Sequence, residues 1–310
     1  MGFLRFGETL KERRFLFRCY TAGMNLNCAL VMQGGGTRGI YTAGALDYLM
    51  EQGITFDAVY GTSAGALCGT DYLSGDIGRT KILMTKYMMD LKFVSFTRLL
   101  FTGNLFNFDY LFDELPKKLP FNFEQFDKSP MRFFLGVTCL DDGKAYFLEK
   151  GKVPDIWDAI AASSSLPGIA KTPIMIDGKP YLDGGPSCSI GFRFALKDGY
   201  KTFVITTRPK GYRKELIKSA STKRKDAGYK RTYKKYPDFV NACVNWDKTY
   251  NEEMDEMDAL HDEGKILVMY PSKPLKVAVA ERNLKKLEEV YQLGKKDMEK
   301  MLPELLSYLK

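Results

Sequence analysis

Short apolar runs alternate with longer helical patterns in the first part of the chain. Leu26–Met32 has the length and apolar character of a buried strand, and the stretch from about Arg38 to Gln52 has the spacing of a helix. A second strand and helix follow at Ala58–Tyr60 and from Ser63 to about Leu73. This order of strand, helix, strand and helix is typical of a parallel sheet covered by helices.

The alternation continues through the rest of the chain. Further strands are predicted at residues 133–139, 146–148, 203–206 and 266–270, and further helices at residues 154–164 and 282–299. Because parallel strands are joined by helices that cover the sheet, the pattern predicts an α/β fold. We expect a three-layer α/β/α sandwich with a mostly parallel central sheet.

One segment departs from this alternation. Residues 77–126 are rich in Met, Phe and Leu at mixed spacing, which predicts helices and loops inserted between core strands. Such residues either pack as ordinary core or form a lid or lipid-facing wall, and core packing is the more common role.

Composition narrows the class of protein. The chain has 310 residues, 45% of them hydrophobic, which is enough for a substantial core. Its six cysteines form neither a CxxC pair nor a disulfide framework, so a reducing, cytoplasmic setting is expected. No run is apolar enough to cross a bilayer, and charges between Arg5 and Arg14 interrupt any signal peptide.

Positive charge is concentrated in one stretch. Arg208–Lys235 holds twelve Lys and Arg residues and two acids, a net charge of +10, whereas the whole chain carries +8 and the remainder therefore −2. Such a tract is either a solvated, flexible loop or a surface for an anionic partner. We predict peripheral contact with anionic membranes. No nucleic-acid partner is expected, and the oligomeric state stays open.

Candidate chemistry begins between the second predicted strand and its helix, at Gly61-Thr62-Ser63-Ala64-Gly65. In a nucleophile elbow the serine occupies a strained turn and the flanking glycines avoid steric clashes. The helix that follows directs its N-terminal dipole at the developing charge. The pattern predicts that Ser63 is a nucleophile.

A glycine-rich loop lies directly between the first predicted strand and its helix, at Gly34-Gly35-Gly36-Thr37-Arg38-Gly39. Its bare backbone N–H groups suit the oxyanion of acyl transfer. The loop also fits the G-x-G-x-x-G fingerprint, which keeps a nucleotide-binding α/β protein as an alternative. That fold needs an acid at the carboxyl end of the second strand, whereas Asp57 precedes the predicted strand.

The third motif, Asp183-Gly184-Gly185, follows a predicted strand or turn at residues 178–182. Alone, Asp-Gly is ordinary turn chemistry. Beside the other two motifs, it supplies the base that a serine nucleophile needs.

In this combination of motifs the sequence resembles the patatin-like phospholipase family. The resemblance spans about Leu26 to Gly185 and includes the small-residue stretch Ala162–Gly168. It implies a patatin-like fold and a serine acyl hydrolase, of the lipase or phospholipase type, that cleaves lipid acyl esters without a metal or cofactor. Gln33 departs from the family, in which many members carry Asp before the glycines, and this leaves the hydrogen bonding of the loop open.

Carried over by position, the resemblance implies Ser63 as nucleophile and Asp183 as its base. It also implies an oxyanion hole formed by the N–H groups of Gly35, Gly36 and Thr37. The remaining motif positions are Gly34, Arg38, Gly39, Gly61, Gly65, Gly184 and Gly185.

The only histidine, His261, leaves a second mechanism open. A Ser63-Asp183-His261 triad would have the chain order of ordinary α/β-hydrolases. Its surroundings, Asp255–Gly264, read instead as an acidic, solvated helix face that ends at a glycine. We therefore favour a Ser–Asp dyad. A lipid-binding protein that keeps the fold without catalysis is a further alternative.

The expected organisation has four parts: an N-terminal extension at 1–24, a patatin-like catalytic core at 25–207, the basic segment at 208–235, and C-terminal helices and a strand at 236–310 that complete the domain. Translation could start at Met1 or Met24. The expected substrate is a lipid or phospholipid ester, and neither its head group nor its acyl chain follows from the sequence.

Overall fold

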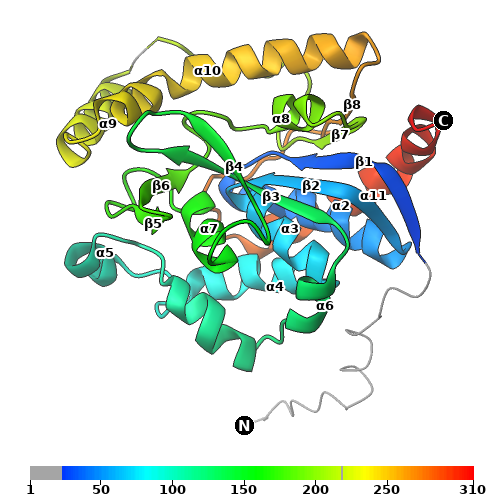
Figure 1. Ribbon diagram of the computed structural model, residues 1–310, viewed down its shortest axis with the longest axis horizontal. Coiled ribbons are helices and arrows are strands. Elements are labelled where there is room, and N and C mark those ends of the chain that lie inside the picture. The colour runs from blue at the N-terminus through cyan, green and yellow to red at the C-terminus, as the bar shows by residue number, and fades with distance from the viewer. Residues whose placement is uncertain (1–22, 218) are drawn as a thin grey trace.

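A sheet of eight strands forms the centre of the computed structural model, which describes residues 23–217 and 219–310 (Figure 1). The strand order is β5-β6-β3-β2-β1-β7-β8, with β4 paired to β3. The strands are β1 (Met24–Met32), β2 (Ile54–Thr62), β3 (Arg132–Cys139), β4 (Ala145–Glu149), β5 (Ile174–Ile176), β6 (Lys179–Asp183), β7 (Thr202–Ile205) and β8 (Leu267–Met269).

Most neighbouring strands in the sheet run parallel. This holds for β1, β2, β3, β7 and β8, whereas β4 and β6 are antiparallel to β3, and β5 is antiparallel to β6. The mostly parallel sheet predicted from the alternating pattern is therefore confirmed. Residues 1–22, which make up most of the expected N-terminal extension and include Cys19, lie outside the described residues.

Helices cover both faces of this sheet (Figure 1). One face packs against α2 (Gly39–Glu51), α3 (Ala64–Ser74), α7 (Ile156–Ser163) and α11 (Leu284–Tyr308). The other face packs against α8 (Phe192–Lys197) and α10 (Pro237–Asp262). Three layers result, as expected.

Strand β1 shows why the sheet is covered twice. Leu30 and Met32 join the hydrophobic cluster under α2 and α11, whereas Ala29 and Val31 join the cluster under α8 and α10. Successive side chains of a strand point to opposite faces, so the unbroken apolar run Cys28–Met32 must be buried on both.

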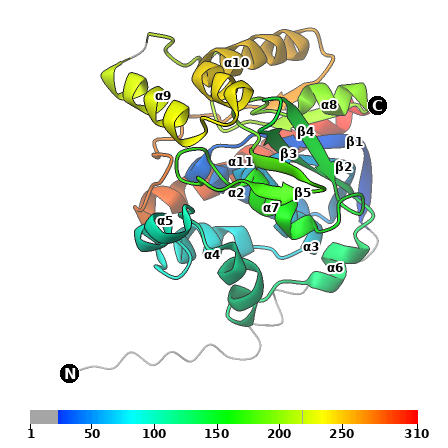
Figure 2. The same cartoon turned by 60° about the vertical axis from the view of Figure 1, so that its left-hand side comes forward.

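The Met- and Phe-rich segment forms the predicted helices and loops, which lie together on the α3 side of the sheet (Figure 2). They have a small core of their own, which includes Leu83, Phe93 and Tyr110. The elements are α4 (Arg79–Thr85), η3 (Tyr87–Met89), α5 (Phe96–Thr102), η4 (Tyr110–Glu114), η5 (Leu115–Lys117) and α6 (Phe123–Lys128).

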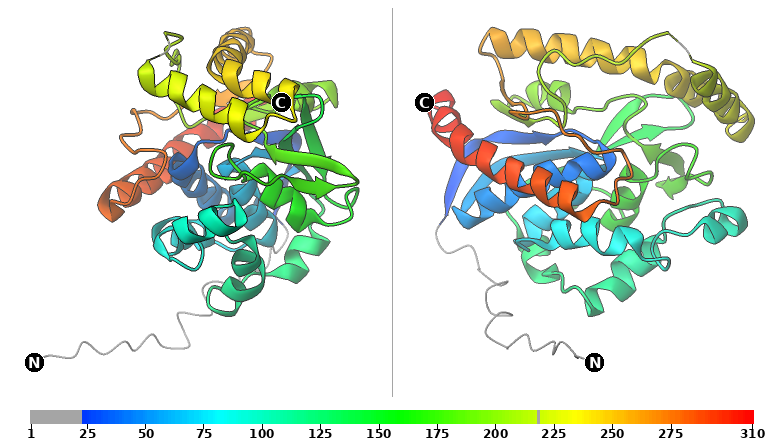
Figure 3. Two further views of the ribbon diagram at one scale, coloured as in Figure 1. Left: turned by 90° about the vertical axis from the view of Figure 1, so that its left-hand side faces the viewer. Right: turned by 180° about the vertical axis from the view of Figure 1, so that it is seen from behind.

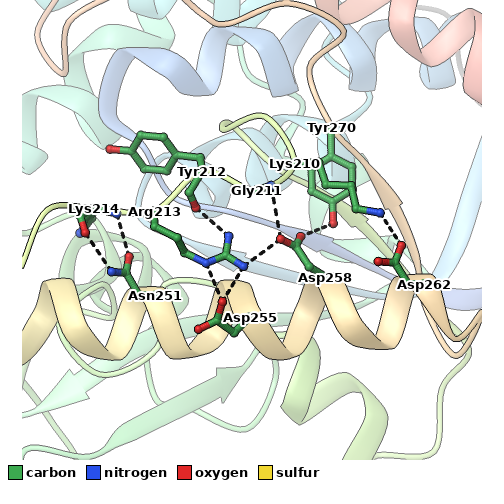
Figure 4. Close-up of polar contacts among 10 residues, drawn as sticks. All are labelled: Lys210, Gly211, Tyr212, Arg213, Lys214, Asn251, Asp255, Asp258, Asp262 and Tyr270. Atoms are coloured by element: carbon green, nitrogen blue, oxygen red, sulfur yellow. Dashed lines mark hydrogen bonds and ion pairs between the residues drawn. The ribbon is translucent and has the colours of Figure 1, made fainter.

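The first part of the basic segment is bound to α10. Arg213 forms ion pairs with Asp255 at 2.7 Å and with Asp258 at 2.9 Å, and Lys210 pairs with Asp262 (Figure 4). Asp255 and Asp262 remain largely exposed, as we predicted for this acidic face, whereas Asp258 is mostly covered. The second part of the segment is helix α9 (Ala220–Thr232) rather than a loop.

Among the described residues, no helix combines the length and apolar character that crossing a bilayer requires. The five cysteines in this part of the chain are buried free thiols.

Candidate active site

Ser63 lies at the junction of β2 and α3 in a strained conformation. Its φ of 57° and ψ of −122° fall in a region that non-glycine residues rarely adopt, at a cost of about 1–3 kcal/mol. The Ser63 N–H donates to the Ser163 hydroxyl at 3.1 Å, and that hydroxyl donates to the carbonyl of Gly136 at 2.7 Å. Ser163, in the small-residue stretch noted from the sequence, therefore helps to hold the turn.

Two glycines make this turn possible. A Cβ atom on Gly65 would lie 2.5 Å from the carbonyl oxygen of Met32, and one on Gly61 would lie 2.6 Å from the carbonyl oxygen of Gly65. Neither distance is tolerable, so the G-x-S-x-G spacing is required by close backbone contact between β1, β2 and α3.

Asp183 is the last residue of β6 and is fully buried. Its Oδ1 accepts a hydrogen bond from the Gly185 N–H at 2.8 Å. The Ser63 hydroxyl is close enough to interact with the same carboxyl group. Among the described residues, no group donates a well-formed hydrogen bond to Oδ2, so this oxygen can still accept one.

The environment of Asp183 changes its acidity. Burial raises the pKa of its carboxyl to about 7, and the interactions with Ser63 and the Gly185 N–H act in the opposite direction. A carboxyl with a pKa near neutrality can accept a proton and release it again under cellular conditions, as general-base catalysis requires.

The glycine-rich loop follows β1 and passes into η2 (Gly36–Arg38). Among the described residues, the N–H groups of Gly35 and Gly36 make no internal hydrogen bond, whereas the Thr37 N–H donates to the carbonyl of Val279 at 2.9 Å. Of the three expected oxyanion donors, the N–H groups of Gly35 and Gly36 are therefore unoccupied in this conformation, whereas that of Thr37 is already hydrogen-bonded. Gly36 has a φ of 58°, which favours glycine.

Gln33 lies where many family members carry Asp, and both polar atoms of its side chain form hydrogen bonds. Its Nε2 donates to the Tyr250 hydroxyl at 2.8 Å, and its Oε1 accepts from the Thr207 N–H at 2.7 Å. These bonds tie the loop to α10 and to the end of β7, which resolves the question that the sequence left open.

Two cavities meet at Ser63. A cleft of about 520 Å³ is lined by Ser63, Asp183 and the glycine-rich loop. An apolar pocket of about 70 Å³ adjoins the same serine and is walled by the inserted segment, through Leu83, Met84, Met88, Phe93, Phe106 and Phe108. The insertion therefore serves both roles considered for it, as packed core and as an apolar wall.

The structure separates His261 from these groups. His261 lies in the last turn of α10, which leads into β8 at the amino end of that strand, whereas Ser63 follows the carboxyl end of β2. Its ring packs near Tyr270, at 5.6 Å between centroids, and it lines neither cavity.

The nucleotide-binding alternative also lacks its acid at the required place. Asp57 lies in the middle of β2, where its Oδ1 accepts a hydrogen bond from the Asn25 amide at 2.7 Å. Within residues 23–217 and 219–310, no three His, Cys, Asp or Glu side chains gather as a metal site would require.

Sequence reasoning missed the groups that C-terminal elements bring to the cleft. Trp246 of α10 packs so closely on Gly185 that a side chain there would overlap its ring. Arg208, Lys214 and Lys225 line the same cleft. The charge run was visible in the sequence, but only the fold shows that part of it lines the same cleft as Ser63.

Similarity to known proteins identifies the family of this chain. A family model described as patatin-like phospholipase matches residues 30–196, and a model described as a domain of unknown function (DUF6363) matches residues 236–310. The uncharacterized protein YjjU of Escherichia coli is 30% identical over 278 residues, which is 86% of this chain and 74% of YjjU.

Lysophospholipase nte1 of Emericella nidulans is 32% identical over 169 residues. That match covers 50% of this chain but only 10% of the fungal protein. The crystal structure of VipD from Legionella pneumophila aligns with a TM-score of 0.48 at 12% identity, covering 90% of this chain and 67% of VipD. With a family model matching more than half of its length, the chain belongs to the patatin-like phospholipase family.

Proposed function

We propose that this protein is a serine acyl hydrolase that cleaves lipid acyl esters through a dyad of Ser63 and Asp183. The observation that carries the proposal is a buried carboxyl, with a pKa near 7, beside a serine held in a strained strand-to-helix turn. Family membership supports the same activity.

The reaction proceeds in two steps. Asp183 takes the proton of the Ser63 hydroxyl as the oxygen attacks the ester carbonyl, and the N–H groups of Gly35 and Gly36 stabilise the oxyanion. The carbon–oxygen bond to the alcohol breaks, the alcohol leaves with the proton, and the acyl group stays on Ser63. Water then attacks the acyl-enzyme with Asp183 again as base, which releases the fatty acid.

The apolar pocket supports a lipid acyl chain as the group transferred. Leu83, Met84 and Phe108 are among its walls, and Ser63 lies where it opens into the cleft. A chain in this pocket would leave water, whereas a short, polar acyl group would gain nothing there.

A fluorophosphonate probe tests the nucleophile. We expect one adduct in the intact mass of the wild-type protein and none in Ser63→Ala, together with turnover of a chromogenic ester that the substitution abolishes. Ser165→Ala, which changes a nearby buried serine, is the matched control and should still be labelled. An unlabelled wild-type protein, or a labelled Ser63→Ala variant, would contradict the proposal.

A further inference from the structure

The cleft beside Ser63 has a strongly basic side. Arg208, Lys214 and Lys225, all from the basic segment, line the cavity that contains Ser63 and Asp183. The backbone of Lys214 is fixed by the side chain of Asn251 in α10. Its N–H donates to Asn251 Oδ1 at 2.8 Å, and its carbonyl accepts from Asn251 Nδ2 at 2.9 Å (Figure 4). Lys214 therefore belongs to the built wall of the cleft. Arg208 lies over the Tyr212 ring at 4.2 Å, and Lys225 is an exposed residue that lines the same cleft.

The cations of this wall are only partly neutralised. Lys214 pairs with Asp247 at 2.9 Å, but among the described residues neither Arg208 nor Lys225 has a carboxylate within ion-pair distance. Burial lowers the pKa of Lys214, and the charges of Lys225 and Arg208 lower it further. Like charges held together in a partly buried cleft create a positive potential that a bound anion would relieve.

Aromatic rings in the cleft argue against a choline-type head group. A quaternary ammonium binds over aromatic faces. Here the Lys214 ammonium already lies 5.0 Å from the Trp246 ring and 4.5 Å from the Tyr250 ring, and the Lys225 ammonium lies 5.3 Å from Trp246. The protein's own cations occupy the positions that a choline group would need.

We propose that Arg208, Lys214 and Lys225 form a subsite for the phosphate of a substrate whose head group is net negative. The inference rests on the proposed acyl-hydrolase function. Ser63 lies between an apolar pocket and this basic wall, and an amphiphile with an acyl chain and an anionic phosphodiester has the matching polarity. Arg and Lys are the side chains that bind phosphate most strongly, through charge-assisted hydrogen bonds.

The test compares two soluble lysophospholipids with the same short acyl chain, used below their critical micelle concentrations so that membrane binding plays no part. Lysophosphatidylglycerol carries a net negative charge and lysophosphatidylcholine carries none. We expect kcat/KM to favour the glycerol lipid by roughly tenfold, because both lipids present a phosphate but only the choline cation is repelled by Arg208, Lys214 and Lys225. Lys225→Gln and Arg208→Gln should each remove most of this preference.

Lys223→Gln is the matched control, because Lys223 lies in α9, as Lys225 does, but does not line the cleft. It should keep the wild-type preference. A preference that survives in both Lys225→Gln and Arg208→Gln, or a wild-type enzyme that hydrolyses both lipids equally, would overturn the subsite.

Binding to Ser63→Ala separates this inference from the proposed function. Calorimetry with the same two lipids should show tighter binding of the glycerol lipid, and Lys225→Gln in that background should abolish the difference. If the wild-type protein hydrolyses no ester but this binding preference is present, the acyl-hydrolase proposal fails and the subsite stands. If esters are hydrolysed but Ser63→Ala binds both lipids equally, the subsite fails alone.

Discussion

The two residues of the proposed dyad are held by strain and by burial. Ser63 is held at a left-handed φ by contacts on both sides, and Asp183 is excluded from water at the end of β6. Each arrangement costs folding free energy, and each makes a side chain more reactive than it would be in water. We infer that the surrounding glycines and hydrogen bonds are present to hold these two groups together.

The identity of the base can be tested by two substitutions. Asp183→Asn keeps the shape of the side chain but removes the proton acceptor, so kcat should fall by at least about 100-fold, the lower range for general-base catalysis. His261→Ala should change kcat little, because His261 lines neither cavity. Turnover of a chromogenic ester by both folded variants is the measurement. A His261→Ala enzyme as impaired as Ser63→Ala would establish the triad instead.

The pH dependence of turnover follows from the same carboxyl. Asp183 acts as a base only when ionised, and burial raises its pKa to about 7. The value of kcat/KM should therefore rise between pH 5 and pH 8 with a midpoint near 7, instead of the midpoint near 4 of an ordinary aspartate. An ester whose rate of spontaneous hydrolysis is low at pH 8 serves as substrate. A flat profile over this range would argue against Asp183.

At the scale of residues, the sequence indicated candidate site residues but not which of their polar groups are already hydrogen-bonded. The three motifs indicated Ser63, Asp183 and the glycine-rich loop as candidates, because each motif is short and depends on local backbone geometry, and the cleft brings the three together. The bond from the Thr37 N–H to Val279 joins positions far apart in sequence, and no local pattern indicates it. The same holds for Trp246 against Gly185.

Packing between helices depends on glycines outside the motifs. Helices α2 and α11 pack against each other (Figure 3). A Cβ on Gly294 of α11 would overlap the carbonyl group of Tyr41 in α2, and one on Gly44 of α2 would overlap that of Tyr291 in α11. The two helices can approach only where both side chains are absent. The C-terminal helix is thereby fixed against the helix that follows the glycine-rich loop.

Gly294→Ala should therefore destabilise the protein although alanine favours helices. Overpacking of this kind costs about 1–3 kcal/mol in free energy of unfolding. Gly228→Ala is the matched control, since Gly228 lies within α9 with no atom near its Cβ position. That change should leave stability equal or raise it by up to about 1 kcal/mol. Urea denaturation measures both, and equal effects of the two substitutions would refute the packing argument.

Elements were predictable where a single periodicity dominated. The strands β1 and β3 were expected within two residues of their observed bounds, because both-face burial gives unbroken apolar runs, and the bounds of helix α2 were expected within one residue. Of the nine residues of β2 only Ala58–Tyr60 were predicted, and Asp57, expected before the strand, lies within it because polar residues interrupt its first half. Helix α10 was recognised only at its acidic end, since its buried residues, including Tyr250 and Met254, are widely separated by polar ones. The three-residue strand β5 is too short for any period to show.

Across the whole molecule, buried carboxyls make stability depend on pH. Burial raises the pKa of Asp47 and Asp76 to about 6 and of Asp183 and Glu253 to about 7. Between about pH 4.5 and pH 7 the folded protein holds protons that the unfolded chain has released. Stability should therefore decrease as the pH rises through this window, and the effect should level off above pH 7.

Glu253→Gln isolates one of these groups. Glu253 accepts a hydrogen bond from the Ser189 N–H at 2.9 Å, which a glutamine oxygen can also accept. The free energy of unfolding should decrease less between pH 5 and pH 7.5 in this variant than in the wild type. Glu299→Gln, at an exposed position of α11, should keep the wild-type slope. A wild-type protein that gains stability over this interval would contradict the assignment.

The distribution of charge over the fold also restricts how the protein could meet a membrane. Lys210, Arg213 and Lys214 are paired with carboxylates of α10, and Lys225 faces the cleft. Among the described residues, the cations of the basic segment left for an anionic bilayer are thus the exposed ones on and after α9, apart from Lys225. Leu216 and Ile217, which are 55% and 89% exposed, lie just before that helix and could enter the interface.

We predict that α9 carries the affinity for anionic membranes. Each cation near such a surface contributes about 1 kcal/mol, so replacing Lys223, Arg224 and Lys230 with Gln should weaken binding by roughly 100-fold at low salt. The control replaces Lys285, Lys296 and Lys300, three exposed lysines of α11, and removes the same net charge from another face. Co-sedimentation with vesicles of phosphatidylglycerol and phosphatidylcholine measures the difference, and high salt should abolish it. Equal losses of binding in the two variants would mean that net charge governs binding, and not the position of α9. Undiminished binding to vesicles of pure phosphatidylcholine would rule out an electrostatic contact altogether.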